Sequence, residues 1–340
     1  MPRTGRLHID GGYYHVIGRG LERRRIFSGD DDKKDFLERL GVGLEQNECQ
    51  CLAFAIMSNH YHLLIKVSTQ PLSKLMSRLL SGYATYYNNR KKRSGYVFQN
   101  RYKSILCDAD NYLLELIRYI HLNPIKANML SSLEKLDGYC WTGHAGIMGK
   151  HLYAWHDQQA VLNLFARQRK TAVKRYRQFI QEGMNYQETK DLSGGGLVRS
   201  YGGWDSIKFL RKEHEVRIGD ERILGDSDFV ESVLKNDTLN MSKRTDRKEK
   251  GWDLDKLILT VCDYFDVEQT ALQRKGRQNT VSLAKSLICY WGTQEIGLSS
   301  TVIASFLNIS QPAVSKGIKR GEEYCLLHKL EFNDFLVCEC

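Results

Sequence analysis

The stretch CLAFAIMSNHYHLLIKV, residues 51–67, shows how the first part of the chain folds. It consists of two mostly apolar runs, Cys51–Met57 and His60–Val67, separated by a Ser-Asn pair. Short apolar runs bounded by turn residues are typical of buried β-strands. The stretch therefore predicts two consecutive strands in a sheet.

The second run contains two histidines, His60 and His62, on either side of Tyr61. Because successive side chains of a strand point to opposite faces, the two imidazoles are expected on one face and the phenol on the other. Neighbouring imidazoles can bind a divalent cation. By itself the pair leaves a second interpretation open, a half-exposed polar face without a ligand.

The residues around this stretch alternate between strand and helix patterns. Tyr13–Ile17 reads as a short strand, and a helix is expected to begin at Asp30. Two further helices are predicted over Leu72–Asn88 and Asp110–Asn123, the second bent or ended by Pro124. This order indicates an α+β domain in which helices back a small sheet.

The predicted helix before Pro124 carries a second candidate pair, Tyr119 and Asn123. Residues four apart share a face of a helix, so a phenol and an amide oxygen would point in the same direction. A phenol can act as a nucleophile and an amide oxygen can bind a cation. The alternative is an ordinary tyrosine followed by a helix end.

Composition and charge narrow the class of protein. The chain has 340 residues, of which 42% are hydrophobic, and a mean hydropathy of −0.45, values typical of a globular protein of two or three domains. We expect neither a membrane span nor a signal peptide. Nine cysteines without a Cys-x-x-Cys motif predict reduced thiols and a cytoplasmic protein. The net charge of +10 suggests a polyanionic partner, and residues 1–150 hold 22 Lys and Arg against 14 Asp and Glu.

Part of this positive charge lies among aromatic residues between positions 86 and 103. Basic and aromatic side chains together suit single-stranded nucleic acid, because bases stack while cations follow the phosphates. A solvated loop beside core aromatics is the alternative. The candidate DNA-binding residues here are Arg90, Lys91, Lys92, Arg93, Arg101 and Lys103.

Glycine clusters and charged runs divide the chain into segments 1–150, 151–250 and 251–340. The middle segment is expected to begin with a helix over Gln158–Glu182 and to continue through Gly-rich turns between residues 193 and 204. The polar run Asn240–Lys250 reads as a solvated linker. We can assign no chemistry to this mostly helical middle segment.

The last segment contains a helix-turn-helix pattern over Ser299–Lys316. Ser299 and Ser310 are expected to cap its two helices. This pattern resembles the C-terminal DNA-binding domain of the replication initiator DnaA; a plain helical bundle is the alternative. The resemblance implies a second helix that reads duplex DNA through outward side chains, namely Gln311, Ser315, Lys316, Lys319 and Arg320.

Several motifs between residues 8 and 150 together resemble the HUH single-tyrosine transposases of insertion sequences, and among them the REP-associated tyrosine transposases. They occur in the order of the family: Tyr14-His15-Val16 with Arg19-Gly20, Met57–Ile65, Phe98–Ser104, Tyr119–Pro124 and Tyr139-Cys140-Trp141.

This resemblance implies a ferredoxin-like α+β nuclease domain with an antiparallel sheet backed by helices. It assigns His60, His62 and Asn123 as ligands of Mg²⁺ or Mn²⁺ and Tyr119 as the nucleophile. It further implies that the substrate is a hairpin of single-stranded DNA and that cleavage passes through a 5′-phosphotyrosine intermediate, which allows the strands to be rejoined without ATP. The expected location is the nucleoid. His15 and His121 are interpreted as structural.

Two other functions remain open at this point. The chain could be a DNA-binding regulator built on an inactive transposase core, or a metal-dependent phosphodiesterase that activates water and does not need Tyr119. The DNA sequence recognised and the oligomeric state, monomer or dimer, are not predicted.

Overall fold

The computed structural model describes residues 6–185, 220–273 and 279–335. The chain divides into two compact units, Met1–Val233 and Leu234–Cys340, and each is described separately. The Gly-rich turns expected between residues 193 and 204 lie outside the described residues. Among the described helices, none has both the length and the apolar character needed to cross a bilayer.

The first unit is built on a five-stranded sheet in the order β2-β3-β1-β4-β5. The first four strands are β1 (Tyr13–Arg19), β2 (Gln50–Ile56), β3 (His60–Lys66) and β4 (Lys103–Cys107), and every neighbouring pair of them is antiparallel. The two-residue strand β5 (Ile223–Leu224) adds a parallel edge beside β4, which was not predicted.

The connections between these strands give a ferredoxin-like βαββαβ unit. Helix α1 (Asp30–Gln46) joins β1 to β2, and helix α2 (Leu72–Arg90) joins β3 to β4. The α+β prediction is therefore confirmed. Strand β4 was missing from the predicted elements, since it is short and follows directly on the mixed basic and aromatic residues before position 103.

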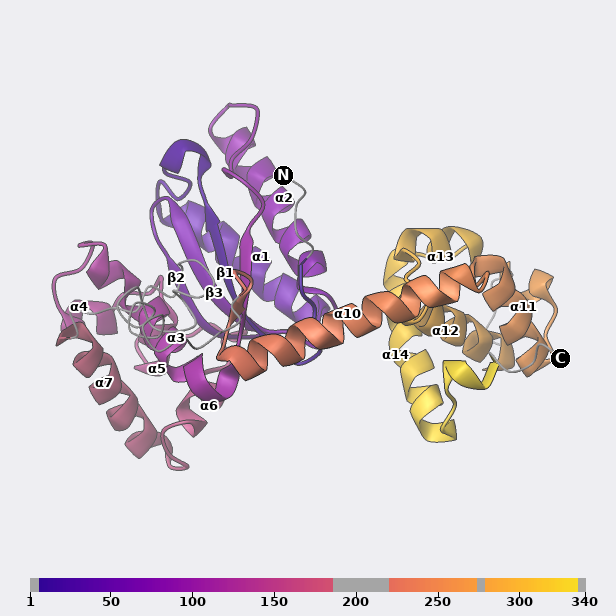
Figure 1. Ribbon diagram of the computed structural model, residues 1–340. Helices are drawn as coiled ribbons and strands as arrows, with labels where there is room; N and C mark the ends of the chain where they lie inside the picture. The colour runs from indigo at the N-terminus through magenta and orange to yellow at the C-terminus, as the bar shows by residue number, and fades with distance from the viewer. Residues whose placement is uncertain (1–5, 186–219, 274–278, 336–340) are drawn as a thin grey trace, which may run out of the picture. The chain divides into compact units, whose positions relative to one another are not determined.

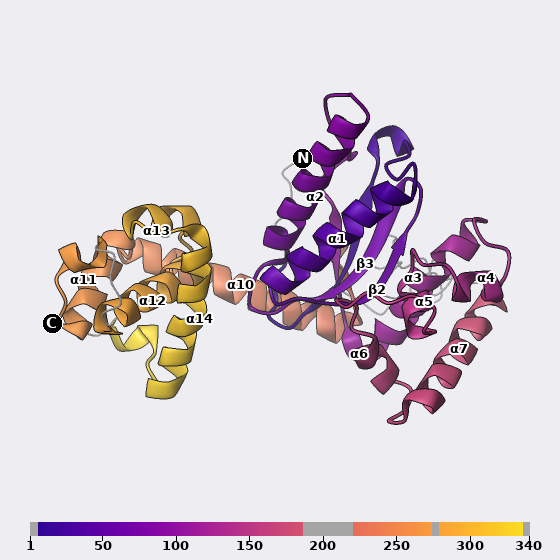
Figure 2. The same ribbon diagram turned by 180° about the vertical axis from the view of Figure 1, so that it is seen from behind.

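Helices α1 and α2 pack against each other and cover one face of the sheet (Figure 1). Figure 2 shows them side by side in front of the strands. The ring of Tyr61 points to this side, where its centroid lies 4.9 Å from that of Phe36 on α1. A side chain at Gly18, the partner of Tyr61 in the β1–β3 ladder, would collide with the Tyr61 phenol. Glycine at position 18 therefore leaves room for the buried ring.

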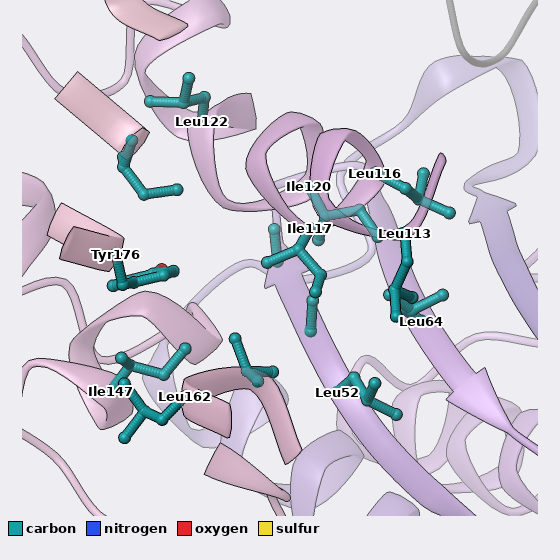
Figure 3. Packing of buried hydrophobic residues seen from close by; sticks show 14 of the residues in the cluster. Leu52, Leu64, Leu113, Leu116, Ile117, Ile120, Leu122, Ile147, Leu162 and Tyr176 are labelled. Atoms are coloured by element: carbon teal, nitrogen blue, oxygen red, sulfur yellow. The ribbon is translucent and has the colours of Figure 1, made fainter. Parts of the chain in front are cut away.

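Helix α3 (Ala109–Lys126) covers the opposite face and contacts β2 and β3. Its apolar row packs against strand residues such as Leu64, as Figure 3 shows for Leu113, Ile117 and Ile120. The helix is capped by Asp108, whose side chain accepts from the amide of residue 110. This amphipathic packing fixes which side of α3 faces the sheet.

The helix continues through Pro124 to Lys126, so of the two predicted effects of the proline, a bend or an end of the helix, the end is ruled out. Proline has no amide hydrogen for the carbonyl of Ile120. The side-chain amide of Asn123 lies 3.5 Å from that oxygen and donates at 2.9 Å to the carbonyl of Tyr119. Asn123 thereby supplies a donor close to the point where the backbone ladder lacks one.

Residues beyond 150 belong to the same core. The helices that follow are α4 (Leu133–Asp137), α5 (Gly143–Ile147), α6 (Gln158–Asn163) and α7 (Arg169–Asn185), so one predicted helix, 158–182, is two. Tyr176 of α7 is fully buried in the cluster formed by α3, as Figure 3 shows. The compact unit thus includes residues that sequence analysis assigned to a separate middle segment.

The second unit is helical. The predicted linker at 240–250 is part of a helix, α10 (Ser227–Glu249). The following elements are α11 (Leu254–Phe265), a 3₁₀ turn η2 (Gln269–Gln273), α12 (Asn279–Gln294), α13 (Ser300–Phe306), α14 (Gln311–His328) and η3 (Phe332–Phe335). Trp252, Trp291 and Phe332 share a core with the buried faces of α11 to α14.

The buried His156 should make the first unit less stable in acid. Its Nε2 donates to the carbonyl of Leu52 at 3.0 Å, and burial lowers its pKa from 6.5 to about 4. As the pH falls below about 6.5 the unfolded chain takes up this proton first, so stability is full above that pH and declines toward pH 4. We expect His156→Gln to make the slope of the unfolding free energy against pH shallower by about 1.4 kcal/mol per pH unit, because one fewer proton is taken up on unfolding. Urea denaturation from pH 7 to 4 measures it; the exposed His151→Gln should leave the slope unchanged.

Candidate active site

Strand β3 and helix α3 bring three of the predicted residues together. His60 and His62 lie on the sheet face that α3 covers, and their ring centroids are 5.2 Å apart. The half-buried ring of Tyr119 projects from α3 with its centroid 5.8 Å from that of His62, nearly perpendicular to it. The tyrosine and the histidine pair therefore face a common space.

His15, which sequence analysis interpreted as structural, belongs to the same group. Its Nε2 lies 2.9 Å from Nδ1 of His62, and the two rings stack with centroids 5.2 Å apart. Its ring is also 5.8 Å from that of Tyr119. Nothing in the linear pattern indicates this contact, because it arises from the antiparallel pairing of β1 with β3.

Both candidate ligands have their Nδ1 atoms occupied. His62 Nδ1 contacts His15, and His60 Nδ1 lies 2.6 Å from Oδ1 of Asn59. An imidazole that donates Nδ1–H to a neighbour carries its lone pair on Nε2. Histidines that bind metals are usually oriented in this way by a second hydrogen bond. Where each of these rings donates from Nδ1, its Nε2 keeps the lone pair that a cation would need.

Both imidazoles are neutral at physiological pH. Burial lowers the pKa of His60 to about 4, with a contribution from the charge of Arg19. Burial also holds the pKa of His62 well below its ordinary value, and His15, His60 and Arg19 lower it further. A neutral ring does not have to lose a proton before it binds a cation.

Asn123 has its amide oriented by the helix backbone. Because Nδ2 donates to the carbonyl of Tyr119 at 2.9 Å, Oδ1 is the atom left to bind a cation. Among the described residues, no three His, Cys, Asp or Glu side chains are placed to hold a metal ion. Two imidazoles with an amide oxygen would form a donor set that suits Mn²⁺ and accepts Mg²⁺.

Lys126 is a neighbour of Tyr119 that sequence analysis missed. Its Nζ lies 5.0 Å from the centroid of the Tyr119 ring, two helical turns further along α3. Burial, together with the charge of Arg118, lowers the pKa of Lys126 to about 8. The spacing of seven residues was the available signal. A cation beside the ring favours the anionic form of the phenol.

His121 faces away from this group, into a buried hydrogen-bonded network. Its Nδ1 lies 2.8 Å from the hydroxyl of Tyr176, which lies 2.7 Å from Nδ1 of His144. Nε2 of His144 contacts Asp137 at 2.8 Å. The network connects α3 to α7 through polar groups with defined geometry and so helps to hold the helix that carries Tyr119.

The predicted DNA-binding residues of the first unit lie in two places. Lys103 is exposed on β4 opposite Ile17, and Arg101 is exposed two residues before it. Arg90 and its neighbours lie at the end of α2, on the helix layer of the other face. There the guanidinium of Arg90 forms ion pairs with Asp31 and Asp32 at 2.9 and 2.6 Å. Lys91 and Lys92 are exposed, and Arg93 donates to the carbonyl of Tyr96 at 3.1 Å.

In the second unit a turn joins α13 to α14, and both serine caps are confirmed. Ser299 accepts from the amide of Val302 and Ser310 from that of Ala313. Of the residues expected to point outward, Ser315 is partly buried and the others are exposed: Gln311, Lys316, Lys319 and Arg320. Gln311 donates to Oγ1 of Thr301 on α13 at 2.9 Å, and Arg320 to Oγ of Ser282 on α12 at 3.3 Å.

Comparison with known proteins finds similarity to one protein family and to solved structures. Residues 8–123 match the family described as transposase IS200 like. A solved structure of a REP-associated tyrosine transposase bound to a REP hairpin is 12% identical, with a TM-score of 0.38, over 45% of this chain and 88% of that one. No curated protein matches the chain.

The contact between His15 and His62 leads to a prediction about cation binding. His15→Phe keeps an aromatic ring but removes the acceptor for His62 Nδ1, so the orientation of the His62 ring is lost. We expect the affinity for Mn²⁺ to fall about 10- to 100-fold, measured by electron paramagnetic resonance of the free ion. His8→Phe, at an exposed position paired with Asp10, is the control. Equal affinities in the two variants would contradict a role for His15.

Proposed function

Because residues 8–123 match the family described as transposase IS200 like, we propose that this chain is a metal-dependent single-stranded DNA endonuclease that also rejoins strands. One observation carries this proposal: the Tyr119 ring lies 5.8 Å from that of His62, on the sheet face that holds the histidine pair. A nucleophile and a pair of cation ligands in one space suit attack on a phosphodiester.

In the proposed reaction, Oη of Tyr119 attacks the phosphorus of the scissile phosphate. A bond forms between this oxygen and phosphorus, the bond from phosphorus to the 3′ oxygen breaks, and the phenolic proton is lost while the 3′ oxygen gains one. The products are a 5′-phosphotyrosine on Tyr119 and a free 3′-hydroxyl. Because the new bond is again a phosphodiester, a 3′-hydroxyl can reverse the step without ATP.

The residues around Tyr119 meet the needs of this step. His60, His62 and Asn123 would hold Mg²⁺ or Mn²⁺, which when bound polarises the phosphate and offsets its charge. A free phenol has a pKa near 10, so it is mostly protonated at neutral pH. Lys126 stabilises the phenolate electrostatically, because its ammonium group lies 5.0 Å from the ring centroid.

The proposed substrate is single-stranded DNA that folds into a hairpin, encountered at the nucleoid in the cytoplasm. The REP-associated transposase in the solved structure is bound to a REP hairpin. Two features of this chain support a DNA substrate: its net charge of +10, and the exposed Arg101 and Lys103 at the start of β4. The positions near the end of α2, namely Arg90, Lys91, Lys92 and Arg93, are further candidates, although the ion pairs of Arg90 leave less of its charge available.

We further propose that the second unit reads a duplex part of the substrate through a helix-turn-helix formed by α13 and α14. The capped turn between them and the exposed face of α14 support this proposal. The second candidate function is that of a DNA-binding regulator built on an inactive transposase core. Such a protein would bind DNA but would not cleave it.

Replacing the proposed nucleophile separates these functions. Wild type and Tyr119→Phe are incubated with Mn²⁺ and labelled hairpin oligonucleotides with randomised single-stranded extensions, then resolved on a denaturing gel. We expect a covalent adduct with wild type only, a loss of cleavage on the order of 10⁴-fold or more in the variant, and unchanged binding.

Tyr112→Phe is the matched control, since Tyr112 is a half-buried residue on the same helix. It should cleave like wild type. Cleavage by Tyr119→Phe would instead indicate a phosphodiesterase that activates water. Binding by wild type without any adduct would indicate the regulator.

The role of α14 is tested with an exposed lysine on its presented face. Lys316→Ala should weaken binding to a hairpin with a long duplex stem and reduce the slope of log affinity against log salt by about 1, because one phosphate contact is lost. Lys329→Ala, at the other end of α14, is the control. Equal salt slopes for Lys316→Ala and wild type in fluorescence anisotropy would argue for a plain helical bundle.

A further inference from the structure

Besides Arg24, three exposed arginines lie at the end of β1 and in the loop that follows it: Arg19, Arg23 and Arg25. Within the described parts of the chain, none of the three has a carboxylate partner. The acidic residue of the loop, Glu22, is paired with Arg24. Arginines that are not neutralised internally are available to bind an anion from outside the protein.

Arg19 is the arginine closest to the site in the sheet. It is the direct partner of His60 in the antiparallel β1–β3 ladder, so both side chains emerge on the same face. Its charge contributes to keeping the pKa of both His60 and His62 low. An anion bound to these histidines through a cation would therefore also lie within the field of Arg19.

The loop has a fixed backbone. Glu22 and Arg23 both have left-handed conformations, with φ of 53° and 61°. Such conformations are costly for non-glycine residues and persist where the surroundings determine them. Here the buried hydroxyl of Tyr83 donates to the carbonyl of Ile26, and that of Tyr87 to the carbonyl of Arg25.

Asn59 connects this loop to the histidine pair. Its Oδ1 contacts Nδ1 of His60 at 2.6 Å, and its Nδ2 donates to the carbonyl of Arg23 at 3.1 Å. Its own carbonyl accepts from the amide of Gly20 at 2.8 Å. A side chain at Gly20 would collide with the carbonyl of Arg24, so the loop can fold back only with glycine there. One residue therefore orients a candidate cation ligand and the arginine loop.

We propose that the loop Arg19–Arg25 binds the backbone of the single DNA strand beside the cleavage point, with Arg19 holding the phosphate at or next to the scissile one. This inference rests on the proposed function, since that function supplies the DNA strand. A rigid guanidinium binds phosphate through two parallel hydrogen bonds, so the loop positions the strand and does not merely attract it.

The test uses the full chain and the hairpin oligonucleotide recovered as the covalent adduct with Tyr119. Binding is measured without divalent cations, so that no cleavage occurs. Arg19→Ala should weaken binding about tenfold or more, the usual effect of losing a charge-assisted hydrogen bond, and reduce the salt slope by about 0.7. Arg19→Lys should restore the salt slope but only part of the affinity. Arg78→Ala, an exposed arginine on α2 that covers the other face, is the control and should bind like wild type.

A second measurement identifies the phosphate. Each linkage near the cleavage point is replaced in turn by a neutral methylphosphonate. At the linkage held by Arg19, the replacement should weaken binding by wild type but not by Arg19→Ala. Equal losses for both proteins at every linkage near the cleavage point would overturn the inference, and so would wild-type affinity and salt slope in Arg19→Ala.

These results are distinguishable from failure of the proposed function. If no hairpin forms an adduct with wild type, the proposed function fails. If wild type forms the adduct and Arg19→Ala binds normally, only the inference about the loop fails. Thermal unfolding and circular dichroism of Arg19→Ala show whether it is folded. Should it be unfolded, Arg19→Lys and the double variant Arg23→Ala, Arg25→Ala replace it. Wild-type affinity in Arg19→Lys, or an unchanged salt slope in the double variant, would then overturn the inference.

Discussion

The alternation of side chains along β3 is the constraint on which the rest of the first unit depends. Tyr61 points into the core formed with α1 and α2, and His60 and His62 point to the face covered by α3. A shift of the strand by one residue would place the phenol among the polar groups and both imidazoles in an apolar core. The close packing of Tyr61 on Gly18 opposes such a shift. Core packing and site geometry are therefore two results of one register.

The site is organised as much by its neighbours as by its own residues. His15 and Asn59 occupy the Nδ1 atoms of His62 and His60, which leaves each Nε2 for a ligand. Burial keeps both rings neutral. Burying polar groups is costly unless they are hydrogen-bonded, so these contacts contribute to stability and to function at once.

Helix α3 must hold Tyr119 over the sheet, and segments distant in sequence help it to do so. Its apolar row packs on β2 and β3, while His121 on its other side contacts Tyr176 of α7. Residues after position 150 are thus part of the unit that holds Tyr119, although the family match ends at residue 123. The second unit has a core of its own, with Trp252 and Trp291 among its buried residues.

Local sequence patterns determined much of this protein: strands β2 and β3, helices α1 to α3, the serine caps of α13 and α14, and the relation of Tyr119 to Asn123. These follow from periodicity and capping, which act over a few residues. Strand β4, the helix that replaces the expected linker, and the partners His15, Asn59 and Lys126 could not be obtained in this way. Strand β4 and the contact of His15 depend on pairing between distant segments, and a spacing of seven residues has meaning only once the helix is known to pass through Pro124. The side chains of His15 and His62 are 47 residues apart in sequence and form a hydrogen bond between neighbouring strands. Only the pairing of strands in the folded sheet decides which distant residues meet in this way.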